Sequence, residues 1–491
     1  MLDPALENAG ASSREYRRWF ATLVILVAVG QMLGLTMRMP SQLEANDISR
    51  WCTVWSLLER GTYRIDDCPW QNKTQDKVFK ALPNAAPGDD AKHFYSSKPP
   101  LLPTIIAGIL YPFRVATGVP LDAHVLQKRV ERTYLKEDPI ELGKYELVTE
   151  TPPDARWSVY VFYFKPIIIL LNIVPFAILL IRFARYLDRT TEHDWTWFIA
   201  LSAAAFATPL TVFLTTLNNH IVAAWSAYFA AEALMKIWAN SRTSDHPAGG
   251  ATFAAAGFFG AFCACNELPA AAFGALLFFC CVASDPRRTL LYFVPAAVVP
   301  LTAFFITQYQ ATGGWIPVYS EFGTASYTGY EWSYWNTPLE MDWFDKHPEP
   351  KALYLFHMML GHHGMFSLTP IFLCSLIAMF GVAFGKPGAI RSLARLTIGL
   401  SALVIGFYVY KTNNYGGSTQ GLRWLFWIYP FWLMLLPPAL DAARARRGLR
   451  LGVYALFALS VFSVGYGMRS PWTHPWVLDM LEHLDVYVLT R

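Results

Sequence analysis

The chain has 491 residues, of which 54% are hydrophobic and only 15% are charged. Soluble domains carry about 25% charged residues, and a soluble protein of this length would show amphipathic periodicity instead of long apolar segments along almost the whole chain. The net charge of +4 is small and its Lys and Arg residues gather in short loops, which indicates membrane topology and not nucleic-acid binding.

The first element expected is a transmembrane helix over residues 19–37. It follows a basic segment, residues 1–18, that contains Arg14, Arg17 and Arg18. The apolar run is too long for the hydrophobic region of a signal peptide, and no small-residue cleavage site follows it. We therefore expect this helix to be retained, with the N-terminus in the cytoplasm.

Residues 38–157 are rich in charge and proline and predict a large extracytoplasmic loop that carries juxtamembrane helices. Within it, residues 101–118 are apolar enough to cross the membrane, but a crossing there would invert every later basic loop. We interpret this segment as a re-entrant or interfacial helix, with a full crossing as the alternative. Cys52 and Cys68 also lie in the loop, and both a disulfide and two free thiols stay open because sequence does not show the required geometry.

About eleven spans are expected, since each apolar run approaches the ~20 residues that a bilayer requires. They lie near residues 19–37, 158–182, 195–214, 221–238, 251–265, 269–284, 289–307, 369–384, 396–411, 424–440 and 451–467. Basic residues fall in alternate loops, at 182–189, 236–242, 287–288, 386–395 and 444–450. By the positive-inside rule, these loops are cytoplasmic and the C-terminus is extracytoplasmic.

This topology divides the chain into a transmembrane core at 158–307, an aromatic-rich outer loop at 308–368, C-terminal transmembrane helices at 369–467 and an outer tail at 468–491. The larger polar segments are thus all on the outer side, which indicates that the chemistry takes place there. The fold expected is an all-α polytopic membrane protein.

Two motifs in the first outer loop attract attention. Just past the first span the chain reads Glu-Ala-Asn-Asp47-Ile-Ser-Arg50-Trp51, and the loop closes on Ser97-Lys98-Pro-Pro-Leu. Each has a purely structural interpretation. Asp47 could be the N-cap of a short amphipathic helix over 48–60, and Lys98 with the two prolines could form a rigid turn onto the membrane.

Taken in order, these motifs resemble the first outer loop of the GT-C glycosyltransferases, especially the aminoarabinose–lipid A transferases and the protein O-mannosyltransferases. Those families carry a pattern like Asp-Glu-x-Arg-Tyr after the first span and Glu-Lys-Pro-Pro-Leu or His-Pro-Pro-Leu later. Asp47 and Arg50 match the first pattern, and Lys98 with the Pro-Pro-Leu that follows it matches the second. Two departures matter: Ile48 replaces the second acid, and Ser97 replaces the Glu that is a metal or substrate contact in those families. Because of these departures we expect no cofactor; a divalent metal is the alternative, but the sequence does not support it.

Further polar residues recur at outer junctions. Asn218 and His220 lie in a turn between two spans, Glu267 interrupts an apolar stretch, and Arg423 opens a late span. An acid at membrane depth costs about 2.5–3.5 kcal/mol on insertion scales, so it is a functional hypothesis by default. The alternatives are helix capping for Asn218 and His220, an ion pair for Glu267, and snorkelling to lipid headgroups for Arg423.

The resemblance implies a membrane glycosyltransferase that moves a sugar, with inversion, from a polyprenyl-phosphate donor to an extracytoplasmic lipid, glycan or protein acceptor. Asp47 is then the general base, and Lys98 and Arg423 stabilise the leaving phosphate. The other substrate-binding residues expected are Arg50, Asn218, His220 and Glu267. The expected location is a bacterial inner membrane, with membrane lipids and no nucleic acid as partners. A transporter or lipid flippase, or a non-catalytic GT-C-like membrane protein, are the alternatives.

Overall fold

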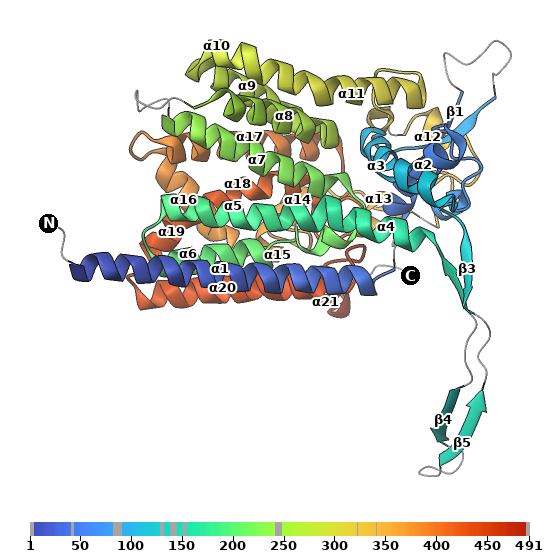
Figure 1. The fold of residues 1–491 in the computed structure, drawn as a ribbon, viewed down its shortest axis with the longest axis horizontal. Coiled ribbons are helices and arrows are strands. Elements are labelled where there is room, and N and C mark those ends of the chain that lie inside the picture. Colours follow the sequence, from blue (N-terminus) through green and yellow to red (C-terminus); the bar gives the residue numbers. More distant parts are fainter. Residues whose placement is uncertain are drawn as a thin grey trace.

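The computed structural model describes residues 4–40, 44–81, 91–127, 132–137, 145–150, 155–240, 248–321, 323–339 and 341–487. Parts of the predicted outer loop 38–157 and the last residues of the predicted tail, 488–491, lie outside these ranges. Figure 1 shows a bundle of helices that run along its long axis, with a cap of shorter elements at one end.

The bundle is made of apolar helices that differ in length. Its helices are α1 (Pro4–Arg38), α4 (Tyr160–Ile168), α5 (Val174–Thr190), α6 (Asp194–Phe206), α7 (Asn219–Asn240), α8 (Gly250–Asn266), α9 (Ala271–Ser284), α10 (Pro286–Arg288), α11 (Val294–Thr312), α16 (Phe372–Ala383), α17 (Ala389–Lys411), α18 (Tyr429–Met434), α19 (Pro437–Ala443) and α20 (Arg447–Gly467). The π-helical turns η2 (Ile169–Ile173) and η5 (Thr289–Phe293) join α4 to α5 and α10 to α11.

Among the described residues, five helical segments are long and apolar enough to cross a membrane, or six if the bent pair α18 and α19 counts as one span. The five are Ser13–Arg38, Tyr160–Thr190, Pro286–Thr312, Ala389–Lys411 and Arg447–Gly467. These helices indicate an integral membrane protein. The expected number of about eleven spans is not confirmed, because α6, α8, α9 and α16 have 13, 17, 14 and 12 residues and a full crossing takes ~20.

Helix α7 is the centre of the bundle. It is buried on nearly every face and packs against α8 and the 3₁₀ helix η7 (Arg423–Ile428). Its many alanines, such as Ala223, Ala227 and Ala230, are 0% exposed. Small side chains let neighbouring helices approach closely, which is how helices pack tightly when the surroundings are as apolar as the core.

The cap holds α2 (Ala45–Arg60), α3 (Leu101–Thr117) and a two-stranded sheet. Strands β1 (Lys77–Lys80) and β2 (His93–Ser96) pair antiparallel, with Val78 opposite Tyr95. Arg114 of α3 donates to both oxygens of Glu59 of α2, each at 2.8 Å. The segment expected to be re-entrant or interfacial thus forms a helix of 17 residues that packs against α2 at this end of the bundle.

The expectation of an all-α chain misses six short strands. Besides β1 and β2, strand β3 (His124–Gln127) pairs antiparallel with β6 (Ala155–Ser158), and β4 (Arg132–Glu137) pairs with β5 (Tyr145–Glu150). Figure 1 shows the β4–β5 hairpin extending away from the bundle. The strands have only four to six residues each, so their alternation is short and easily missed inside a long charged loop.

Further short helices come from the later segments that were expected to be outer loops. These are the 3₁₀ helix η6 (Val318–Glu321) and helices α12 (Ala325–Thr328), α13 (Trp343–Lys346), α14 (Lys351–Met359), α15 (Met365–Leu368) and α21 (Trp476–His483). The cap core holds the two cysteines of the first outer loop. Cys52 and Cys68 are both buried and both free, and burial, together with a hydrogen bond to Cys68, raises the pKa of the Cys52 thiol.

Candidate functional site

Polar side chains from seven distant segments meet where the cap joins the bundle. The segments are the first two turns of α2, the loop before β1, the loop before α3, the start of α7, the break between α8 and α9, the start of η7 and the chain after α20. They contribute Asp47, Arg50, Asp76, Lys98, Asn219, His220, Glu267, Arg423 and Trp472.

Asp47 lies inside the first turn of α2 and is 0% exposed. The helix begins after Glu44, so the N-cap interpretation of Asp47 is wrong. Its Oδ1 accepts a hydrogen bond from the Leu217 backbone N–H at 2.5 Å, and its Oδ2 accepts from the Trp472 indole N–H at 3.0 Å. Burial raises the pKa of Asp47 to about 7, although the Leu217 N–H and the Arg50 charge act in the opposite direction.

Arg50 starts a chain of hydrogen bonds that crosses three segments. One of its terminal nitrogens donates to the Leu217 carbonyl at 3.3 Å, and the other donates to Oδ1 of Asn219. The Asn219 amide in turn donates to Glu267 Oε1 at 3.1 Å, and His220 Nδ1 bonds to the same oxygen. All four side chains are buried. The network fixes the turn before α7 against the break between α8 and α9.

That break explains why Glu267 reaches the network. Helix α8 ends at Asn266, and the 3₁₀ turn η4 (Leu268–Ala270) carries Pro269 in its first turn. Proline lacks a backbone N–H, so the helix cannot continue through it with regular hydrogen bonds. The Glu267 side chain, 6% exposed, therefore leaves the helix axis at the site and meets Asn219 and His220.

Asn218 makes its hydrogen bonds within the turn before α7 and the first turn of that helix, and not with the network that Asn219 and His220 join. Its Oδ1 accepts from the backbone N–H of Ile221 at 2.9 Å, and its amide donates to Thr216 Oγ1 at 2.6 Å. These are the contacts of a residue that caps the start of α7, in line with the structural alternative for this position. A substrate contact for Asn218 stays a prediction.

Arg423 is the first residue of η7 and is 8% exposed. Its guanidinium lies 4.8 Å from the centre of the Trp472 ring. Within the part of the chain that the structure describes, its Nε and Nη1 are buried without a hydrogen-bond partner. Buried polar groups are nearly always paired in native proteins, so this guanidinium has capacity to bind an anion.

The glycine turn before η7 leaves room for that guanidinium. Gly416 has φ +101°, and a Cβ there would lie 3.1 Å from Arg423 Nε. Gly417 has φ +77°, and a Cβ there would meet nothing within 4 Å. The backbone N–H of Gly417 donates to Asn414 Oδ1 at 2.8 Å. Only the first glycine is needed for the space around Arg423, although both adopt a left-handed backbone.

The pair Gly416 and Gly417 therefore gives a matched test of Arg423. Alanine at either position is strained by about 1–2 kcal/mol in the left-handed region, so both variants should lower the unfolding temperature by similar amounts. Only Gly416→Ala also pushes on Arg423, and we expect it to weaken the binding of phosphate anions at least several-fold more than Gly417→Ala. Equal phosphate affinities for the two variants, measured at a temperature where both are folded, would contradict a role for the position of Arg423.

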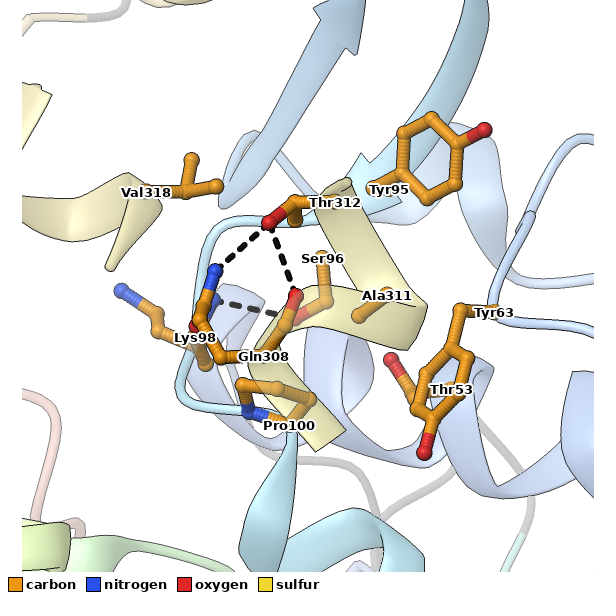
Figure 2. Close-up of a pocket in the computed structure, with 10 residues that line it drawn as sticks. All are labelled: Thr53, Tyr63, Tyr95, Ser96, Lys98, Pro100, Gln308, Ala311, Thr312 and Val318. Atoms are coloured by element: carbon orange, nitrogen blue, oxygen red, sulfur yellow. Dashed lines mark hydrogen bonds between the residues drawn. The ribbon is translucent and has the colours of Figure 1, made fainter. Parts of the chain in front are cut away.

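Lys98 adds a third cation. Its ammonium lies 2.8 Å from Asp76 Oδ1. Burial lowers the pKa of Lys98 to about 8; Asp76 opposes this shift, and the charges of Arg50 and Arg423 add to it. The side chain also lines a small pocket with the end of α11 (Figure 2), where Gln308 donates to Thr312 at 2.6 Å. In that view the ammonium points away from the two tyrosines on the opposite wall, Tyr63 and Tyr95.

The structure thus places six of the seven site residues expected from sequence in one buried region, as a connected network or beside it. It also brings in Asp76, Asn219 and Trp472, which the sequence did not single out. Asn219 lies between Asn218 and His220, which the sequence did single out, and this adjacency is a signal by which Asn219 could have been found. Asp76 and Trp472 lie in no recognisable motif, and only the fold shows that they take part.

No protein-family model matches the sequence, and no curated protein matches it significantly. Among solved structures, the chain is similar to the apo form of the oligosaccharyltransferase of Archaeoglobus fulgidus, with a TM-score of 0.40 and 11% sequence identity. The match covers 93% of this chain and 55% of that chain, so this protein spans about half the length of the structure it matches. A TM-score of this size assigns neither a family nor an activity to the chain.

Proposed function

We propose that the chain is a membrane glycosyltransferase that moves a sugar from a lipid-linked phosphate donor to an acceptor at the outer face of the membrane. One observation carries the proposal: among the described residues the buried Arg423 has N–H groups without a hydrogen-bond partner, and it lies near the buried Arg50 and the partly buried Lys98. A guanidinium without a partner in a buried site is costly unless an anion completes it. Phosphate is the anion whose oxygens match the guanidinium fork best.

The position of the site supports a lipid-linked donor. The cationic residues lie where the bundle meets the cap, at the end opposite to the start of α1 (Figure 1). If the basic segment 1–18 is cytoplasmic, this end is extracytoplasmic, and a phosphate at the membrane surface can reach the site while its polyprenyl chain stays in the outer leaflet. We propose in addition that the membrane is a bacterial inner membrane. The loops 38–157 and 308–368 and the tail 468–491 then lie on its outer side.

Asp47 is the general base in this proposal. An acceptor hydroxyl takes the place of the Trp472 indole N–H at Asp47 Oδ2 and gives its proton to the carboxylate as its oxygen bonds to the anomeric carbon. The bond from that carbon to the phosphate oxygen breaks in the same step, so the configuration inverts. Arg423 and Lys98 donate to the phosphate as negative charge builds on it. A base with a pKa near 7 is well matched to proton transfer at neutral pH.

The remaining polar groups would hold the sugar. Glu267 and His220 are buried acceptors and donors next to the cations, and hydroxyl groups of a sugar can bond to both. The pocket beside Lys98, lined by Tyr63, Tyr95 and Gln308 among others, has a volume of only about 10 Å³, which is room for one water and not for a sugar ring. Arg50 would act on the reaction through Asp47, whose negative charge it stabilises.

The experiment that tests this function measures free polyprenyl phosphate, the product that the donor releases whichever acceptor receives the sugar. The purified chain is reconstituted in liposomes with polyprenyl-phosphate sugars extracted from bacterial membranes and with a membrane extract as the source of acceptor. Mass spectrometry should show that free polyprenyl phosphate accumulates with time. If no polyprenyl-phosphate sugar is consumed by a folded protein, the transferase proposal fails.

The two titrating groups predict a narrow pH optimum. The raised pKa of Asp47 means that the base is protonated, and inactive, below about pH 7. The lowered pKa of Lys98 means that its charge is lost as the pH rises above about 8. The value of kcat/KM for transfer should therefore peak between these values, and Lys98→Arg should extend the alkaline limb because arginine stays charged. A profile that stays flat from well below pH 7 to well above pH 8 would contradict both assignments.

A further inference from the structure

A second cluster of polar side chains lies outside the candidate site, around α14. Glu349 precedes the helix, His357 is in its last turn, and His362 follows it. One ligand atom from each lies within 4.8 Å of the others. The Nε2 atoms of His357 and His362 lie 3.8 and 3.9 Å from the same oxygen, Glu349 Oε1. These separations are too long for hydrogen bonds.

The distances come close to those around one metal ion between the three groups. Zinc binds histidine nitrogen and carboxylate oxygen at about 2.0–2.2 Å in a tetrahedral arrangement, so two of its ligand atoms are about 3.4 Å apart. The separations of 3.8 and 3.9 Å from Glu349 Oε1 exceed this value by about 0.4–0.5 Å. All three ligand atoms lie within 4.8 Å of one another, so the side chains have to draw together by about 0.4–1.4 Å when the ion binds.

Burial gives an independent sign of a missing ligand. The side chains of His357, His362 and Glu349 are 6%, 0% and 7% exposed. Among the described residues, His362 Nε2 has no hydrogen-bond partner, although it faces Glu349.

Neighbouring groups hold the three side chains in place. The Tyr415 hydroxyl donates to Glu349 Oε2, which leaves Oε1 toward the histidines. His362 Nδ1 is 2.5 Å from Nδ1 of His363. Such outer contacts fix the orientation of metal ligands in known sites. The Tyr487 hydroxyl donates to Glu349 Oε1 at 3.0 Å and is hydrogen-bonded to His357 Nε2 at 2.6 Å, so it bridges these two groups, and a bound ion takes the place of these hydrogen bonds.

We propose that Glu349, His357 and His362 bind a zinc ion, with the fourth position facing the Tyr487 hydroxyl. Two imidazoles and one carboxylate form a ligand set that zinc prefers, whereas magnesium and calcium prefer oxygen ligands. The site does not depend on the transferase function. It joins the outer loop 308–368 to the chain after α20, which also carries Trp472 over Asp47.

The test measures zinc on the full-length protein in detergent. The protein is stripped with a chelator, equilibrated with Zn²⁺, freed of excess metal and analysed by mass spectrometry for zinc content. We expect about one zinc per chain for a single site of this kind, and Zn²⁺ should raise the unfolding temperature. His362→Ala and Glu349→Gln should abolish both effects. His347→Ala, an exposed histidine in the same outer loop, is the matched control and should retain them.

Two results would overturn the proposal. One is a wild-type protein that holds no zinc and is not stabilised by it. The other is zinc binding that persists at full stoichiometry in both His362→Ala and Glu349→Gln. Because substitution of a buried histidine can itself impair folding, Glu349→Gln, which keeps the side-chain volume, decides the case if His362→Ala does not fold.

Discussion

Replacing Asp47 with asparagine should lower the rate of sugar transfer by a factor of about 10²–10⁴, the range that a positioned general base supplies. The amide oxygen can still accept the hydrogen bond from the Leu217 N–H, which the carboxylate accepts at 2.5 Å. The turn before α7 should therefore keep its place, and the loss should arise from the missing base. The measurement is the initial rate at which free polyprenyl phosphate is released in proteoliposomes.

Asp67→Asn is the matched control for this variant. Asp67 is in the same outer loop, but its side chain is 75% exposed and only 3.8 Å from Arg60 across an open surface. We expect transfer at the wild-type rate, because exposed ion pairs contribute little. If Asp47→Asn transfers sugar as fast as Asp67→Asn, Asp47 is not the base, and its two hydrogen bonds serve only to join segments of the fold.

Replacing Arg423 with glutamine should separate function from stability. Transfer should fall by about 10²–10³, the cost of removing one donor from a site that stabilises developing negative charge. The unfolding temperature should stay near that of the wild type or rise. A buried guanidinium whose Nε and Nη1 lack partners within the described residues is destabilising, and a neutral amide removes that cost. Loss of the contact with the Trp472 ring offsets part of the gain.

Arg469→Gln provides the control, since Arg469 is an exposed arginine in the chain just after α20. It should leave both the transfer rate and the unfolding temperature unchanged. A structural role for Arg423 predicts the reverse pattern, in which Arg423→Gln unfolds at a markedly lower temperature and the loss of transfer disappears once folded protein alone is counted.

The membrane class could be predicted from sequence because it rests on composition and on the length of apolar runs, such as the one that forms α1. The number of spans could not. The run 424–440 becomes the separate helices α18 and α19, bent by 47° at their junction before Pro437. Residues 195–214 form a helix only as far as Phe206. Hydropathy records how apolar a run is, but not where its backbone turns.

For the site, sequence indicated residues that stand out where polar side chains interrupt apolar stretches, as Glu267 and Arg423 do. It could not indicate partners that are set by tertiary contacts alone. Trp472 is 425 positions from Asp47 and still donates to its carboxylate. Sequence could not indicate a metal at His362 either, because Glu349 and His357 join it only once α14 has folded.

Binding of a polyprenyl phosphate tests most directly whether the buried cations form a phosphate site. Purified wild-type protein, Arg423→Gln and Arg469→Gln are titrated with the same polyprenyl phosphate in detergent, and binding is followed by calorimetry. Saturable one-site binding is expected for the wild type and Arg469→Gln. Arg423→Gln should bind at least tenfold more weakly, since a charge-assisted hydrogen bond contributes about 1.5–3 kcal/mol. Equal affinity for all three proteins would contradict the site.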